Sequence, residues 1–195
     1  MSPLQKIAMG LLIVFWTAPF AVADYAWDAL PDPLGWVLVL AGVHALRRQL
    51  PIAPVVWTGW LALVASVPQW IAPLFEELLP DGDAVAEASI RWAFFLPQAL
   101  FCVLLARAIG RAAMEQEPRD AWVAGRFGVM TWATGALVVL PPIAYSLDEQ
   151  PLIDATLIGI VVVGLAFCYY LFRVHRRTWL GGPGPLEVHP PPRSS

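Results

Sequence analysis

The length, composition and charge of this chain exclude an ordinary soluble domain. Its 195 residues are 58% hydrophobic and only 14% charged, with a mean hydropathy of +0.64, whereas soluble domains carry about 25% charged residues. The formal net charge is −3, but orientation in a membrane follows the positions of Lys and Arg rather than the net charge. We therefore expect an all-α protein, a polytopic transmembrane helical bundle.

Six apolar segments follow one another along the chain, each near the roughly 20 residues that cross a hydrocarbon core about 30 Å thick. They are residues 7–23, 33–50, 53–74, 90–110, 125–147 and 152–174. These segments predict six spans within a transmembrane domain of residues 1–177. Residues 178–195 are rich in Gly and Pro, which predicts a disordered cytoplasmic tail.

The first segment has a second interpretation. Lys6, the apolar stretch, Pro19 and the small residues Ala21-Val22-Ala23 before Asp24 also fit a cleavable secretory signal. Cleavage after Ala23 would leave five spans, with the C-terminus still in the cytoplasm.

A distinctive motif, Asp28-Ala-Leu-Pro-Asp-Pro-Leu-Gly-Trp36, lies between the first two segments. We expect Asp32 to cap the second helix and Pro33 to be its first residue. Gly35 should let a neighbouring helix approach closely, and Trp36 should lie at the membrane interface. The carboxylates of Asp28 and Asp32 either bind a cation together or serve as a solvated loop acid and a helix cap.

The first quarter of the chain, residues 4–48, resembles small uncharacterised bacterial membrane proteins. These proteins carry the same Asp-x-Leu-Pro-Asp-x-x-Gly-aromatic motif between their first two spans, here Asp28 to Trp36. The resemblance implies a multi-pass protein of the bacterial plasma membrane whose first span is retained. It implies no activity.

Basic and acidic connections alternate between the six segments. The first, third and fifth connections are acidic, whereas the second, the fourth and the tail are basic. If Lys6 is cytoplasmic, eleven of the twelve Lys and Arg residues lie on that side, and Arg91 is the exception. The positive-inside rule therefore predicts that both termini are in the cytoplasm.

A short pattern occurs twice, which suggests an internal repeat. The fourth segment contains Phe101-Cys102-x-x-Leu105-x-Arg107, and the sixth contains Phe167-Cys168-x-x-Leu171-x-Arg173. Apolar sequences also produce such matches by chance, so both explanations stand. A repeat would make the bundle three similar helical hairpins.

Ionisable residues at membrane depth are candidates for functional sites. Arg91 lies at the start of the fourth segment, and its expected partners are the acidic residues Asp24, Asp28, Asp32 and Asp154. Two interpretations of Arg91 remain open. It is either a snorkelling side chain or an ion pair that fixes the fourth helix to its neighbours, or it is an anion contact or one half of a proton-linked pair.

Two glutamines within the spans, Gln69 and Gln98, each follow a proline. Proline frees a backbone carbonyl of the preceding turn, and an amide side chain can donate to it or bridge two helices. The alternative is that both glutamines line a narrow polar path through the bundle.

Two functional hypotheses follow. The first is a non-enzymatic protein of the bacterial inner membrane with an interaction or assembly role, whose partners are the lipid bilayer and a second copy or another membrane protein. The second is a small transporter or channel that uses Arg91, Asp28 and Asp32. We expect no catalytic residue, cofactor, metal or nucleic acid, because zinc-site spacings, a Walker loop, a dinucleotide fingerprint and a Gly-x-Ser-x-Gly motif are all missing from the sequence.

Overall fold

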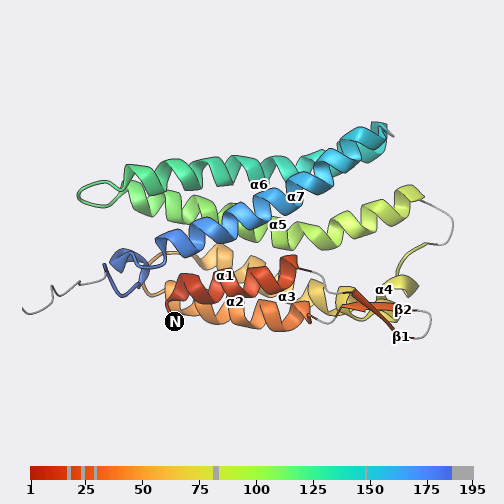
Figure 1. The fold of residues 1–195 in the computed structure, drawn as a ribbon, viewed down its shortest axis with the longest axis horizontal. Coiled ribbons are helices and arrows are strands. Elements are labelled where there is room, and N and C mark those ends of the chain that lie inside the picture. Colours follow the sequence, from red (N-terminus) through yellow and green to blue (C-terminus); the bar gives the residue numbers. More distant parts are fainter. Residues whose placement is uncertain (17–18, 23–24, 29, 81–83, 148, 186–195) are drawn as a thin grey trace, which may run out of the picture.

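The computed structural model describes residues 1–16, 19–22, 25–28, 30–80, 84–147 and 149–185. This part of the chain is predominantly helical and contains seven α-helices and a two-stranded antiparallel sheet (Figure 1). In chain order the elements are α1 (Pro3–Phe15), β1 (Pro19–Val22), β2 (Tyr25–Asp28), α2 (Asp32–Leu46), α3 (Ala53–Trp70), α4 (Ala72–Glu77), α5 (Ala84–Met114), α6 (Ala121–Leu147), α7 (Gln150–Val174) and a 3-10 helix (Thr178–Leu180).

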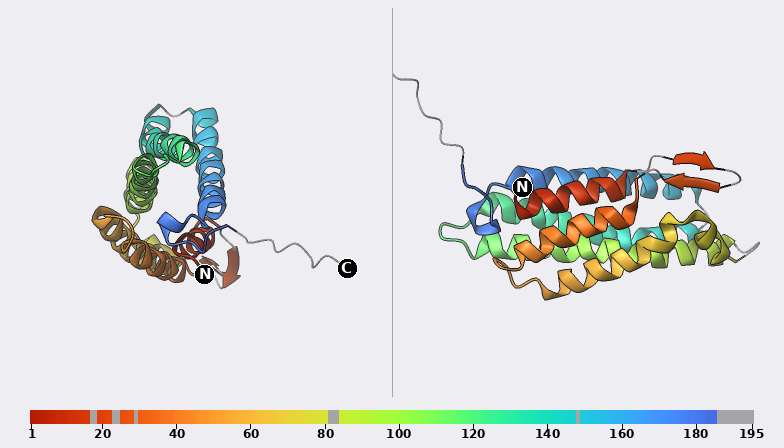
Figure 2. Two further views of the ribbon diagram at one scale, coloured as in Figure 1. Left: turned by 90° about the vertical axis from the view of Figure 1, so that its left-hand side faces the viewer. Right: turned by 90° about the horizontal axis from the view of Figure 1, so that it is seen from below.

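The six longer helices form a ring in chain order (Figure 2). Each of α1, α2, α3, α5 and α6 packs against the next, and α7 packs against α1 to close the ring. Neighbouring helices run in opposite directions, so the ring consists of three helical hairpins, α1–α2, α3–α5 and α6–α7. The short helix α4 and the β1–β2 hairpin extend from one end (Figure 1).

Three of the described helices are long and apolar enough to cross a membrane: residues Val85–Met114 of α5, α6 and α7. Helices α1 and α2 are apolar but shorter, with 13 and 15 residues. At 1.5 Å per residue they extend about 20 Å and 22 Å, less than a hydrocarbon core of about 30 Å. Three of the six predicted spans thus have a described helix of the length and hydropathy that crossing a membrane requires.

The boundary predicted for the first span is wrong. The helix ends at Phe15, and Pro19–Val22 pairs instead with Tyr25–Asp28 in an antiparallel hairpin. Pro19 has no N–H with which to continue a helix. Aromatic and β-branched residues favour strands; Phe20 and Val22 lie in β1, and Tyr25 and Trp27 lie in β2.

Prolines also divide the third predicted span, residues 53–74. Helix α3 ends at Trp70, and Pro73 lies in the first turn of the separate helix α4, a position that suits proline because its missing N–H would be unpaired there. In contrast, Pro68, Pro97, Pro141 and Pro142 lie inside continuous helices.

Helices α1 and α2 are in backbone contact through two glycines. A Cβ atom added to Gly10 would lie 2.5 Å from the carbonyl oxygen of Gly35, and one added to Gly35 would lie 2.8 Å from that of Gly10. This confirms the close approach predicted at Gly35. Trp36, predicted at the interface, is instead buried, with its ring 5.2 Å from that of Phe101 in an edge-to-face arrangement.

The segment after α7 covers the end of the ring where the N-terminus lies (Figures 1 and 2). Leu180 is fully buried in the hydrophobic core to which all six helices of the ring contribute, and Trp179 packs against that core. Gly181, with φ of 74°, makes the turn that follows. The predicted disorder from residue 178 onward is therefore wrong up to residue 185, because burial of Leu180 offsets the cost of ordering the chain. Residues 186–195 lie outside the described part.

Candidate functional site

The interior of the ring is filled with large side chains. Trp36, Phe101, Phe127 and Phe167 are all fully buried there. A cavity of about 30 Å³ lies between α1, α5, α6 and α7, lined in part by Gln98, Cys102 and Thr134. That volume suits about one water molecule, so this cavity has no room for a larger substrate.

A much larger hollow lies between α5 and α6, with a volume of about 1220 Å³. We call it the α5–α6 groove; it is lined by Val103, Ala106, Arg107, Gly110, Arg111 and Met114 of α5, and by Ala121, Ala124, Gly125, Gly128, Thr131, Trp132, Gly135, Ala136 and Val139 of α6. Of the fully buried core residues of these helices, only Ala106 lines it, at its floor, whereas Phe101, Leu105, Ile109 and Phe127 do not. Trp132, by contrast, is 84% exposed. The groove therefore opens away from the core of the ring.

Small residues form the α6 wall of this groove. The helical period places Gly125, Gly128 and Gly135 on one face. A Cβ atom added to any of these three would meet no other atom within 4 Å. They differ in this from Gly10 and Gly35, since no contact within the chain requires them. Their effect is to leave space along an exposed, apolar helix face.

Two arginines line the groove toward its end at the α5–α6 connection. Arg107 and Arg111 are four residues apart on α5 and are both exposed, so they project from the same face of the helix. In the described part of the chain neither forms an ion pair. Both also line a second hollow of about 700 Å³, shared with Glu115, Gln116 and other residues. The apolar groove thus contains two cations that form no ion pair with the described residues, although Glu115 lies in the adjoining hollow.

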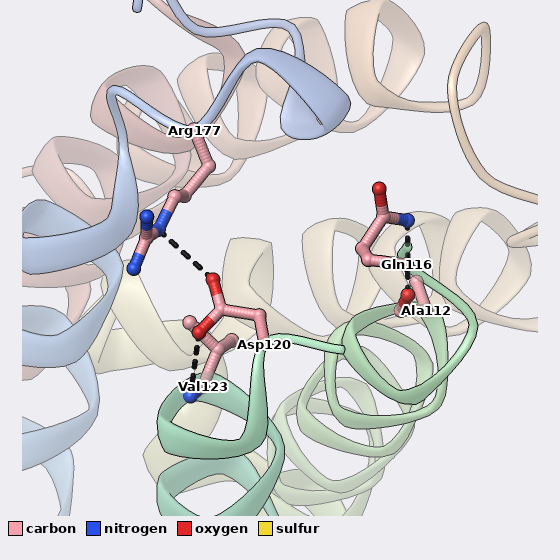
Figure 3. Close-up of polar contacts among 5 residues, drawn as sticks. All are labelled: Ala112, Gln116, Asp120, Val123 and Arg177. Atoms are coloured by element: carbon pink, nitrogen blue, oxygen red, sulfur yellow. Dashed lines mark hydrogen bonds and ion pairs between the residues drawn. The ribbon is translucent and has the colours of Figure 1, made fainter. Parts of the chain in front are cut away.

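Asp120 links the start of α6 to the segment that follows α7 (Figure 3). The backbone N–H of Val123 donates to Oδ1 of Asp120 over 3.3 Å, which makes Asp120 the N-cap of α6. Its Oδ2 lies 3.0 Å from Nε of Arg177, and the Asp120 side chain is only 13% exposed. Figure 3 also shows Gln116, whose amide donates to the carbonyl of Ala112 on its own helix.

We expect Asp120→Ala to lower the free energy of unfolding by about 1–3 kcal/mol, because it removes both a helix cap and a partly buried ion pair. The measurement is thermal unfolding of the purified protein in detergent. Arg177→Ala should cost less, since Asp120 would still cap α6. Equal losses in both variants would contradict the double role of Asp120.

Arg91 pairs with a residue that was not among its expected partners. Its Nε lies 2.9 Å from Oε1 of Glu87, one turn earlier on α5, and both side chains are about half exposed. Its guanidinium also lies over the ring of Phe75 in α4, 5.3 Å from the centroid. This cation–π contact links α4 to α5. In the described structure, one contact of Arg91 therefore stabilises α5 itself and the other holds α4 against it.

Of the other predicted acidic residues, Asp32 and Asp154 do not line the α5–α6 groove. Asp32 is the first residue of α2 and not its N-cap, which is Pro31; its carboxylate still lies where the helix dipole favours negative charge. Asp28 ends β2, opposite Pro19. Asp154 is exposed and accepts a hydrogen bond from Gln150 over 2.8 Å. The side chains of Asp24 and Asp28 lie outside the described part.

The two glutamines differ in their surroundings. Gln69 is exposed and donates to the carbonyl of Ala65, on its own helix, whereas Gln98 lines the small central cavity. A carbonyl left free by a proline is bound by Trp92 and not by a glutamine. Nε1 of Trp92 in α5 donates to the carbonyl of Val138 in α6 over 2.9 Å. Pro142 lies four residues after Val138 and cannot donate to that carbonyl. Trp92 thus bridges α5 and α6.

Within the described residues there is no group of three or more His, Cys, Asp or Glu side chains placed to hold a metal ion. Cys102 and Cys168 are both free and buried.

Reasoning from the sequence missed the α5–α6 groove. The sequence contains part of the pattern that could have predicted it. One helix face, with its three- and four-residue spacing, contains mostly small residues: Ala121, Gly125, Gly128, Trp132 and Gly135. In the sequence, Arg111 contributed only to the prediction of orientation, and Arg107 contributed to that prediction and to the repeated pattern. What could not be foreseen is that this face of α6 points away from the core.

Comparisons with known proteins add no functional assignment. No family model matches the chain, and no curated protein or solved structure is significantly similar to it.

Proposed function

We propose that this protein is a non-enzymatic, multi-pass protein of the bacterial inner membrane with an interaction or assembly role, and that it binds its partner at the α5–α6 groove. The observation that carries this proposal is the position of the unfilled space, most of which lies on the outer face of the ring and not in its interior. The cavity inside the ring has about 30 Å³, whereas the groove on its outer face has about 1220 Å³ and apolar walls. A groove of this kind receives a partner from the bilayer.

The distribution of charge supports an orientation with both termini in the cytoplasm. The N-terminus, the α2–α3 and α5–α6 connections and the end of α7 all lie at one end of the ring (Figure 1). This end contains Lys6, Arg47, Arg48, Arg107, Arg111, Arg119, Arg126, Arg173, Arg176 and Arg177. Because such residues are retained on the cytoplasmic side, the groove's arginines face the cytoplasmic leaflet.

The alternative, a small transporter or channel with a polar path near Arg91, Asp28 and Asp32, has less support. Thr134 and Ser66 donate to carbonyls of their own helices, and Arg91 is half exposed and paired with Glu87. These three polar side chains thus bond to groups within their own helices, which leaves the transporter hypothesis without a described polar path.

Photo-crosslinking in intact cells tests the proposed function. Replacing Trp132 by p-benzoylphenylalanine places the reactive group in the groove, where the native side chain is 84% exposed. We expect a discrete crosslinked product, either a protein or a lipid. The matched control is the same replacement at Ile158, which is 64% exposed on α7 and lines no described groove. Equal, diffuse labelling at both positions would overturn the proposal.

A further inference from the structure

We infer that the α5–α6 groove holds an anionic phospholipid, with an acyl chain along α6 and the phosphate at Arg107 and Arg111. This inference rests on the proposed function and names the chemical class of the ligand. It joins two features that are otherwise unexplained, the apolar space along the glycine face of α6 and the two cations at its end.

The charges at the end of the groove match a lipid phosphate. Arg107 and Arg111 are exposed, share a helix face and form no ion pair with the described residues. Guanidinium groups bind phosphate oxygens through paired, charge-assisted hydrogen bonds. Basic pockets between helices at the cytoplasmic side of a membrane are typical binding sites for anionic headgroups.

The dimensions of the groove match an acyl chain. Gly110, between the two arginines, lies beside Ala124 and Gly128 of α6. From Gly128 the α6 wall continues to Val139, which is about 17 Å at 1.5 Å per residue. One leaflet of the hydrocarbon core is about 15 Å thick. The groove can therefore enclose a chain over the full depth of the cytoplasmic leaflet, starting from a headgroup held at the arginines.

A partner helix fits these observations less well than a lipid. A helix docked along the whole groove would cover Arg107 and Arg111, and covering a cation without a counter-charge is unfavourable. A phospholipid brings its own negative charge to that point. Free phosphate would meet the arginines but would leave the apolar part of the groove unfilled.

Native mass spectrometry of the full-length protein, released from detergent and titrated with either phosphatidylglycerol or phosphatidylcholine, tests the inference. We expect one phosphatidylglycerol to bind more tightly than phosphatidylcholine. The double variant Arg107→Gln/Arg111→Gln should weaken phosphatidylglycerol binding by about fivefold for each arginine, and so remove most of the preference. Inorganic phosphate at the same concentration should not displace the lipid.

Two further variants separate the groove from general charge attraction. Arg47→Gln/Arg48→Gln removes the same charge from exposed positions at the same end of the ring, outside the groove, and should leave the affinity within about twofold. Gly128→Leu fills the groove from a position where a Cβ atom meets nothing within 4 Å. It should weaken the binding of both lipids while the protein remains folded, as judged by its melting temperature.

Three outcomes would overturn the inference. One is an equal loss of phosphatidylglycerol in both double arginine variants, which would indicate attraction to the basic end as a whole. Another is lipid binding that Gly128→Leu does not change. The third is a dimer that Gly128→Leu breaks and Arg107→Gln/Arg111→Gln leaves intact, which would make the groove a helix interface. That dimer would leave the proposed function standing, whereas absence of a specific crosslink at position 132 would remove the proposed function itself.

Discussion

Gly10→Ala should destabilise the protein by about 1–3 kcal/mol, although alanine is the better helix former. The added methyl group would lie 2.5 Å from the carbonyl oxygen of Gly35 and 2.7 Å from Cγ2 of Val39. Because the first of these atoms belongs to the backbone of α2, the two helices must move apart. The melting temperature in detergent, followed by circular dichroism, measures the effect.

Gly125→Ala is the matched control, and its expected effect on stability has the opposite sign. It makes the same chemical change in a helix where the new Cβ atom meets nothing within 4 Å. The melting temperature should stay unchanged or rise, since alanine exceeds glycine in helix propensity by about 1 kcal/mol. Similar losses in both variants would mean that α1 and α2 are not in backbone contact.

Phe101→Ala should cost about 3–5 kcal/mol of unfolding free energy, the range for truncating a buried aromatic residue. Phe101 is fully buried on α5 and meets the edge of Trp36 on α2. Its loss would open a cavity between two hairpins of the ring. Unfolding of the purified protein in detergent, by heat or by denaturant, measures the loss.

Trp132→Ala provides the control for Phe101→Ala. Trp132 is also a large aromatic residue but is 84% exposed, so its truncation should change stability by about 0.5 kcal/mol or less. Phe167→Ala should resemble Phe101→Ala, because Phe167 is fully buried on α7 with its ring 6.3 Å from that of Phe127. If Phe101→Ala were as mild as Trp132→Ala, the ring would not be packed as described.

The repeated pattern has the same exposure in both of its copies. Phe101, Cys102 and Leu105 are buried on α5, as are Phe167, Cys168 and Leu171 on α7, while Arg107 and Arg173 are exposed. The second helices of two hairpins in the ring thus present equivalent faces to the core. We propose that the three hairpins are related; a shared structural register is what an internal repeat would produce.

The sequence alone located the apolar segments that contain the longer helices, although it extended the first and third beyond Phe15 and Trp70. It also predicted that acidic and basic connections alternate. Both are local properties, because segment length, hydropathy and the position of Lys and Arg do not depend on distant contacts. The role of Gly35 was also readable, since a glycine in an apolar helix next to a tight loop marks a close approach.

Only the tertiary structure decided the rest. The strand at Pro19–Val22, the burial of Trp36 and Leu180, and the bond from Trp92 to Val138 all depend on residues far along the chain. Closing the ring determines which face of α6 turns outward, and so turns the spacing of Gly125, Gly128 and Gly135 into a groove that ends at Arg107 and Arg111. Helical periodicity assigns residues to a face, but only packing against other helices decides what that face meets.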